Sequence, residues 1–341
     1  MARMPPASRF ALWMAASGAA LAALAAWSLT VGRYPVGAPE VLRALAAALT
    51  RGSAGLADNA QAVILEVRAP RVAAALVVGA ALSGAGAAFQ ALFRNPLVSP
   101  DILGVSSGCA LGAGAAVLLA LPLAGVQAFA FVGGLAAVGL VVAIAARVGE
   151  RDPLLTLILA GVVVGSLFGA GIALVKFVAD PYNQLPAITF WLLGSFSGVS
   201  PADLGVALVP LAIGLVPLAL LRSRIDLLAL SEDEAASLGV NVRGLRAAVI
   251  VFGTLATAAA VAIAGTIGWV GLLVPHAARL LAGAPFARVF PLSLVLGAGF
   301  MVAVDTACRS AFAVEIPPGV ATAFVGAPVF IALLAATRRA R

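Results

Sequence analysis

Few side chains in this sequence of 341 residues could do chemistry. Its only lysine, Lys176, has a valine before it and a phenylalanine after it. A phosphate-binding loop needs glycines before its lysine and a serine or threonine directly after it. The chain therefore lacks this loop, and we expect no catalytic residue in it and no ATP hydrolysis by it.

Metal ligands are equally sparse. The single histidine, His276, and the two cysteines, Cys109 and Cys308, lie in apolar surroundings. A metal site needs several such ligands together. We expect the cysteines to pack as small hydrophobic side chains and the chain to hold no metal and no cofactor. If the chain transports a metal, the sparse ligands favour a large chelate over a bare ion. The ligands of the chelate already surround its metal, so the chelate suits an apolar path through the protein.

One carboxylate could serve an ion-coupled carrier. Asp305 lies in an apolar segment, and Arg309 follows it by four residues on the same helix face. This spacing favours a structural ion pair, with a transport role for Asp305 as the alternative. A stand-alone secondary carrier is therefore a rival interpretation.

The elements that hold these residues must be embedded in lipid. The chain is 63% hydrophobic and only 10% charged, whereas soluble domains carry about 25% charged residues. Such a chain cannot cover a water-facing surface, which excludes a soluble enzyme and a disulfide scaffold. The net charge of +7 is then an orientation signal, and we expect no nucleic-acid partner.

Ten segments predict ten transmembrane helices, since a helix needs about 20 residues to cross the hydrocarbon layer. The long apolar runs are divided at Leu121-Pro122 and at Gly265 and Gly268. The ten segments are 10–32, 72–93, 102–121, 122–146, 153–175, 204–221, 247–264, 267–281, 289–310 and 316–337. We expect an all-α polytopic membrane protein with a single domain over residues 1–341.

Basic residues orient these segments. Most of the 21 lysines and arginines share one side if the N-terminus is cytoplasmic, so both termini are predicted inside. Arg3 and Arg9 precede the first segment as in a signal peptide, but its apolar run is longer than the ~15 residues of a signal core. We interpret it as a retained helix.

Two connections carry further signals. Residues 41–49 form an amphipathic stretch that we expect to lie along the interface. Within 222–246, Ser231 and Glu234 form a capping box, which predicts a short cytoplasmic helix that stops at Gly239. Glycines also recur at short spacings, which favours close helix packing over hinging. They include Gly79, Gly84, Gly86, Gly161, Gly165 and Gly169.

Two segments give the chain a family resemblance. Residues 89–106 (FQALFRNPLVSPDILGVS) and 265–279 (GTIGWVGLLVPHAAR) resemble the paired signatures of FecCD-type permeases. These are the membrane subunits of type II ABC importers for iron-siderophore, haem or vitamin B12. The resemblance continues through 229–239 and 316–330 and covers nearly the whole chain.

The resemblance implies the type II ABC importer permease fold, with ten helices per subunit, in a multi-pass protein of the bacterial inner membrane. It implies a homodimer with a second permease copy, two cytoplasmic ATPase subunits and a periplasmic substrate-binding protein. Region 222–246 would hold the coupling helix that contacts the ATPase. The residues expected there are Leu230, Ser231, Glu232, Asp233, Glu234, Ala235, Leu238 and Gly239.

Two further sites follow from the resemblance. Arg68 and Arg71, in an Arg-Ala-Pro-Arg motif, and Arg309 match the arginines that dock the binding protein; ordinary interfacial placement is the alternative. The translocation pathway is expected to include Gly161, Gly165, Phe168, Gly169 and Trp191.

The expected function is import of a metal chelate, with ferric siderophore leading and haem or cobalamin behind. A permease for an oxyanion such as molybdate and a stand-alone secondary carrier are the alternatives. A structural or assembly protein is disfavoured, because the family motifs would then have no role.

Overall fold

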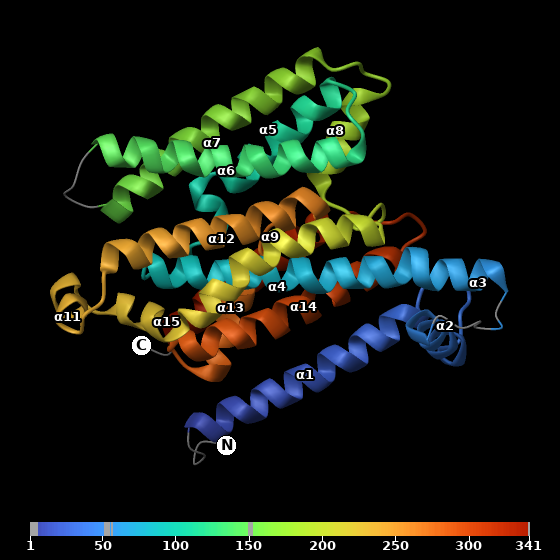
Figure 1. Ribbon diagram of the computed structural model, residues 1–341, viewed down its shortest axis with the longest axis horizontal. Coiled ribbons are helices and arrows are strands. Elements are labelled where there is room, and N and C mark those ends of the chain that lie inside the picture. The colour runs from blue at the N-terminus through green and yellow to red at the C-terminus, as the bar shows by residue number, and fades with distance from the viewer. Residues whose placement is uncertain (1–5, 51–54, 56, 149–152, 340–341) are drawn as a thin grey trace.

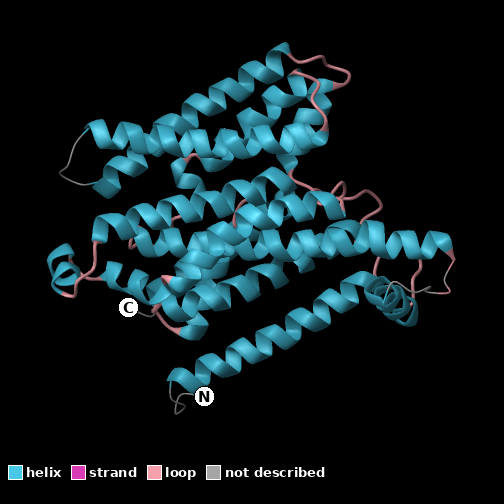
Figure 2. Cartoon of the chain, in the orientation of Figure 1, coloured by secondary structure: helices cyan, strands magenta, loops and turns pink. Residues whose placement is uncertain are grey.

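The computed structural model describes residues 6–50, 55, 57–148 and 153–339, and these residues form helices and no strands (Figure 2). Each of the ten predicted segments contains a helix. These helices are α1 (Pro6–Thr30), α4 (Ala69–Leu92), α5 (Val105–Leu118), α6 (Leu123–Val148), α7 (Pro153–Val178), α9 (Pro201–Leu220), α12 (Val242–Ala264), α13 (Val270–Ala282), α14 (Phe286–Ser310) and α15 (Pro318–Arg339).

Seven helices in the described residues are long and apolar enough to cross a membrane. They are α1, the continuous stretch Asp58–Leu92 that ends in α4, and α6, α7, α9, α12 and α14. Helices α5 and α13 are shorter, with 14 and 13 residues. The prediction of an all-helical membrane protein is confirmed for the described chain, and the crossing of all ten segments stays a prediction.

Short helices join the long ones. α2 (Ala38–Thr50) follows α1, and α3 (Asp58–Ala62) and the π-helical turn η1 (Val63–Arg68) lead into α4. The turn η2 (Pro100–Leu103) precedes α5, and α8 (Gln184–Leu193) follows α7. Between α9 and α12 lie α10 (Arg222–Ile225), η3 (Asp226–Ala229) and α11 (Glu232–Ser237). The amphipathic segment 41–49 is thus helical within α2, which lies across the end of α1 (Figure 1).

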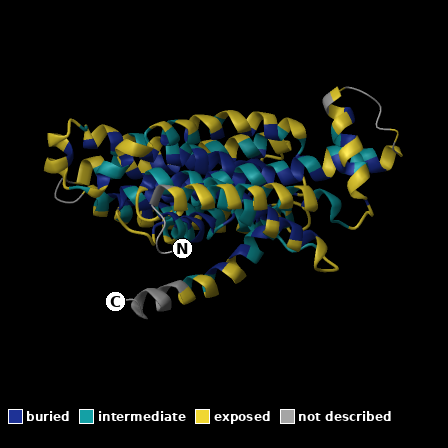
Figure 3. Ribbon diagram, turned by 90° about the horizontal axis from the view of Figure 1, so that it is seen from below, coloured by how far each residue is buried: buried dark blue, intermediate teal, exposed yellow. Residues whose placement is uncertain are grey.

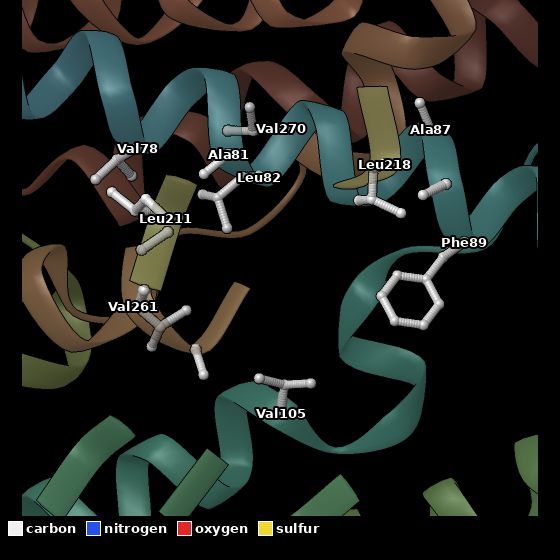
Figure 4. Packing of buried hydrophobic residues seen from close by; sticks show 14 of the residues in the cluster. Val78, Ala81, Leu82, Ala87, Phe89, Val105, Leu211, Leu218, Val261 and Val270 are labelled. Carbon is white, nitrogen blue, oxygen red and sulfur yellow. The ribbon is translucent and has the colours of Figure 1, made fainter. Parts of the chain in front are cut away.

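The long helices form two groups, one on each side of α12 (Figure 1). Figure 1 shows α5, α6 and α7 on one side of α12, and α4, α14 and α1 on the other. α4 and α12 are the most buried long helices, and Val78 and Leu82 of α4 face Leu211 of α9 and Val261 of α12 (Figure 4). The outer faces of α6 and α7 expose apolar side chains such as Val132 of α6 and Leu167 of α7, as suits contact with lipid.

Glycines set how closely the central helices approach. A Cβ added at Gly79 of α4 would lie 2.2 Å from the carbonyl oxygen of Gly297 in α14. A Cβ at Gly86 would lie 2.0 Å from the carbonyl oxygen of Gly271 in α13. No side chain fits in either gap, so the close packing predicted from the glycine spacing is confirmed at Gly79 and Gly86.

The last helix, α15, is packed closely near Trp269 but not along its whole length. Figure 3 shows α15 leaving the body of the molecule at an angle. Gly326 of α15 packs against Trp269, where a Cβ would lie 2.5 Å from the indole Cγ, and Phe330 meets the same ring edge-on at 6.1 Å between centroids. Trp269 has a φ of +71°, a conformation that costs a non-glycine residue about 1–3 kcal/mol. This strained tryptophan anchors α15 to the start of α13.

Candidate functional site

Helix α11 projects at one end of the molecule (Figure 1). The hydroxyl oxygen of Ser231 accepts a hydrogen bond from the Glu234 N–H at 3.3 Å, and the Glu234 carboxylate accepts one from the Ser231 N–H at 3.0 Å. Gly239, with a φ of +77°, ends the turn that follows. The predicted capping box and stop are confirmed. Hydrogen bonds from the backbone and hydroxyl of Ser231 lower the pKa of the Glu234 carboxyl, so protonating this cap takes a more acidic solution than protonating an ordinary glutamate.

Six of the eight expected coupling residues face outward. Ala235 is buried and Leu230 is half-buried, while the remaining six are exposed. Leu238 is 61% exposed at the rim of a cavity of about 530 Å³ that also involves Leu227 and Leu245. Leu238 therefore presents a large apolar side chain to solvent directly after the capped helix α11.

Two residues tie α11 to the membrane helices. Arg94, at the end of α4, has a φ of +50° and donates hydrogen bonds to the carbonyl oxygens of Leu228, at 2.6 Å, and Leu230. Glu232 forms an ion pair with Arg246 of α12 at 2.5 Å. Nothing in the sequence indicates this role of Arg94, because its partners lie more than 130 residues away and no local pattern marks them.

The three arginines expected at the docking site come together at the opposite end of the molecule. Arg68, Arg71 and Arg309 lie where the end of α1, the start of α4 and the end of α14 meet, and all three are buried. Arg68 donates to the carbonyl oxygens of Leu29 at 2.8 Å and Thr30 at 3.1 Å. Their guanidinium groups therefore hold the chain's own segments together.

Asp305 is the centre of this cluster. Arg71 donates to its carboxylate from Nε at 2.9 Å and from Nη2 at 2.7 Å, and Nη2 also contacts Glu315 at 2.5 Å. The Nε of Arg309 is 3.6 Å from the Asp305 carboxylate. The expected pairing of Asp305 with Arg309 is thus present but secondary, and the main partner is Arg71, 234 residues away.

The expected pathway residues are not all brought together. Gly161 packs against the turn η2, where a Cβ would meet the Ile102 carbonyl oxygen at 2.0 Å, whereas Gly169 faces open space. Phe168 is half-buried against the core, and Gly165 lies one turn from it. Trp191 is on α8, which packs against α5 and α15, and lines a small cavity of about 140 Å³.

The structure also contains a cavity of about 580 Å³ that the sequence did not predict. Its walls are η2 and the start of α5, the end of α8, the non-helical residues 266–269 between α12 and α13, and the start of α15. Three motif segments quoted above, containing Asp101, Thr266 and Gly319, therefore meet at one place. Because these segments lie far apart in the sequence, the sequence did not predict that they meet. It did predict a break between helices at Gly265 and Gly268, and Gly268 forms part of this junction.

The described part of the chain contains no cluster of side chains suited to bind a metal ion. No three His, Cys, Asp or Glu side chains gather there as metal ligands. Cys109 and Cys308 are free and buried.

Apolar helices whose backbone is broken where it lines a cavity are typical of membrane transporters. The chain belongs to the FecCD transport family, which matches residues 20–336.

Individual relatives agree with this family. The chain is 38% identical to the molybdate import system permease protein MolB of Haemophilus influenzae, over 92% of both chains. It is 42% identical to a probable iron chelatin transport system permease protein of Helicobacter pylori, over 81% of this chain and 83% of that one. A solved metal-chelate type ABC transporter in an inward-facing conformation is 36% identical, with a TM-score of 0.85 over 94% of this chain and 98% of that one.

Proposed function

We propose that this chain is the membrane subunit of an ATP-binding-cassette importer that carries a metal chelate from a periplasmic binding protein into the cytoplasm of a bacterium. The supporting observation is its likeness to a metal-chelate type ABC transporter along nearly its whole length. Two copies of the chain would form the path, and two separate ATPase subunits would hydrolyse ATP. A ferric siderophore is the leading cargo, before haem or cobalamin.

A permease for molybdate is the second candidate, because the chain is similar to MolB over 92% of its length. Liposomes that contain the permease, its ATPase and its binding protein test both. ATP-dependent uptake of a ferric siderophore supports the proposal, and uptake of molybdate alone replaces it. A secondary carrier would instead accumulate cargo under an ion gradient without partners; against it stands Asp305, whose carboxylate is bound by two arginines.

In this proposal all ten helices cross the membrane and both termini are cytoplasmic. In support, α1 begins and α15 ends toward the end of the molecule that carries α11 (Figure 1). Phe324 and Ile331 on the projecting α15 are exposed, as a face that packs on a second copy would be. Residues Gly161, Gly165, Phe168, Gly169 and Trp191 remain our candidates for lining the path between the copies.

The segment Leu230–Gly239 would be the coupling helix that enters the ATPase. We expect Leu238→Asp to reduce ATP-driven uptake by about tenfold or more, because a charge replaces the exposed apolar side chain that directly follows α11. Thermal stability should be unchanged, since the side chain is 61% exposed. The matched control is Leu119→Asp, which changes a leucine that is 63% exposed in the turn after α5, at the other end of the molecule. Normal uptake by Leu238→Asp would contradict the coupling role.

We place binding-protein docking at Arg68, Arg71 and Arg309. Because these arginines are already bonded within the chain, an incoming carboxylate must displace an internal partner. Glu315 is the most replaceable one, being 35% exposed while Asp305 is 1% exposed.

We therefore expect Glu315→Gln to tighten binding of the binding protein by about three- to tenfold, since a competing charge beside Arg71 is lost. Surface plasmon resonance on the permease in nanodiscs measures this affinity. Glu66→Gln is the control, because it removes an exposed carboxylate on η1. Equal or weaker binding by Glu315→Gln would argue against docking at Arg71.

A further inference from the structure

The cavity of about 580 Å³ at the junction of η2, α8, α13 and α15 holds one ionisable group. Among its lining residues Asp101 is the only one with an ionisable side chain, and Asp101 is exposed. The rest of the wall is apolar side chains, glycines and the hydroxyl-bearing residues Ser106 and Thr266. An acidic group is thus placed in an otherwise uncharged cavity of a membrane protein.

The neighbouring hydroxyls are already committed. Ser106 donates its hydroxyl to one carboxylate oxygen of Asp101, and Thr266 donates to the carbonyl oxygen of Leu192 in the opposite wall. No basic side chain belongs to the lining, so no cation within the cavity offsets the charge. A second carboxylate oxygen is left to accept hydrogen bonds from whatever enters.

The surroundings make this charge effective. The cavity lies where three helices begin, at Val105, Val270 and Pro318, and helix starts carry partial positive charge. A carboxylate offsets part of that positive field close to Asp101 and presents a local acceptor. Across a cavity only several ångströms wide, shorter than the ~10 Å screening length at 0.1 M salt, a unit charge acts on an entering group with little screening.

We propose that this cavity is a charge-selective vestibule on the cargo route, in which Asp101 admits cationic and hydrogen-bond-donating groups and disfavours oxyanions. The place of the cavity on a cargo route rests on the proposed import function, whereas its charge selectivity does not. Within that function, the vestibule suits neutral or positively charged chelates that carry N–H or O–H donors, and opposes molybdate-like anions.

Charged thiol reagents measure the selectivity without any cargo. Ala323 lines the cavity and is exposed, so Ala323→Cys places a reporter thiol there in a background with Cys109 and Cys308 replaced by alanine. The full-length permease is treated with a cationic or an anionic methanethiosulfonate. Each rate is divided by the rate of that reagent with a small free thiol. We expect the cationic reagent to be favoured about fivefold or more, as a unit charge within several ångströms predicts.

Asp101→Asn should bring the two normalised rates together, because it removes the charge and keeps the oxygen that accepts from Ser106. Asp101→Glu should retain the preference. Raising the salt concentration should weaken the preference in the unmodified site, which tests the proposal even if the asparagine variant does not fold. A thiol at Leu119→Cys, outside the cavity, should show no dependence on residue 101.

Equal rates at Ala323→Cys with Asp101 present, or faster reaction of the anionic reagent, would overturn the proposal; the latter would mean that the helix starts dominate. The two proposals fail separately. If the thiol in the cavity prefers the cationic reagent but no ATP-driven uptake is seen, only the import function is contradicted. If uptake is seen but the thiol shows no charge preference, only the selective vestibule is contradicted.

Discussion

Replacing Arg71 by alanine is expected to lower the free energy of unfolding by about 3–5 kcal/mol, because it leaves the buried Asp305 carboxylate without its main partner. Arg71 holds Asp305 through two nitrogens and also contacts Glu315, and Asp305 is 1% exposed. The alanine side chain can neither hydrogen-bond Asp305 nor admit enough water to solvate it.

The two free, buried cysteines allow this loss of stability to be measured. Cys109 and Cys308 react with a fluorogenic maleimide only when the chain opens, so a thermal ramp of detergent-solubilised protein reports unfolding at two distant places. Arg33→Ala is the control, since Arg33 is exposed and donates to the carbonyl of Ala313. The double variant Arg71→Met with Asp305→Leu should recover most of the loss. An unchanged melting temperature for Arg71→Ala would show that the cluster is not structural.

The second large effect is expected at the crossing of α4 and α14. Gly79→Ala should destabilise the protein by about 1–3 kcal/mol, because the new methyl group would lie 2.2 Å from a backbone oxygen of Gly297 and must push the helices apart. The same thiol assay measures it. Gly139→Ala is a matched control on α6, where a Cβ meets nothing within 4 Å, and it should be neutral or slightly stabilising. Equal stability of the two variants would exclude the glycine contact as a packing constraint.

The sequence predicted best what is encoded locally. The capping box of Ser231 and Glu234 needs only four consecutive residues, and it has the expected hydrogen bonds. The ten apolar segments likewise depend on composition within about 20 residues, and each contains a helix. The glycine break before α13 was also visible in the sequence.

Contacts between distant segments could not be predicted in this way. Helical periodicity paired Asp305 with its neighbour Arg309, but nothing local distinguishes Arg71 as the stronger partner. The family resemblance brought the docking arginines into one group without indicating that they are buried. The cavity around Asp101 was missed for the same reason, since its walls come from four separate parts of the chain.

The continuous stretch from Asp58 to Leu92 has a mechanical consequence. Its 35 residues make a rod about 50 Å long. Arg68 and Arg71 are set in it toward one end, and Arg94 follows directly at the other, bonded to the connection that carries α11. The contact between Gly79 and Gly297 clamps the rod near its middle. Because the contact of Gly86 with Gly271 holds the rod at a second point, a tilt imposed at the arginine cluster would have to move α13 and α14 together with Arg94, and no chain of side-chain rearrangements is needed to carry that movement from one face of the molecule to the other.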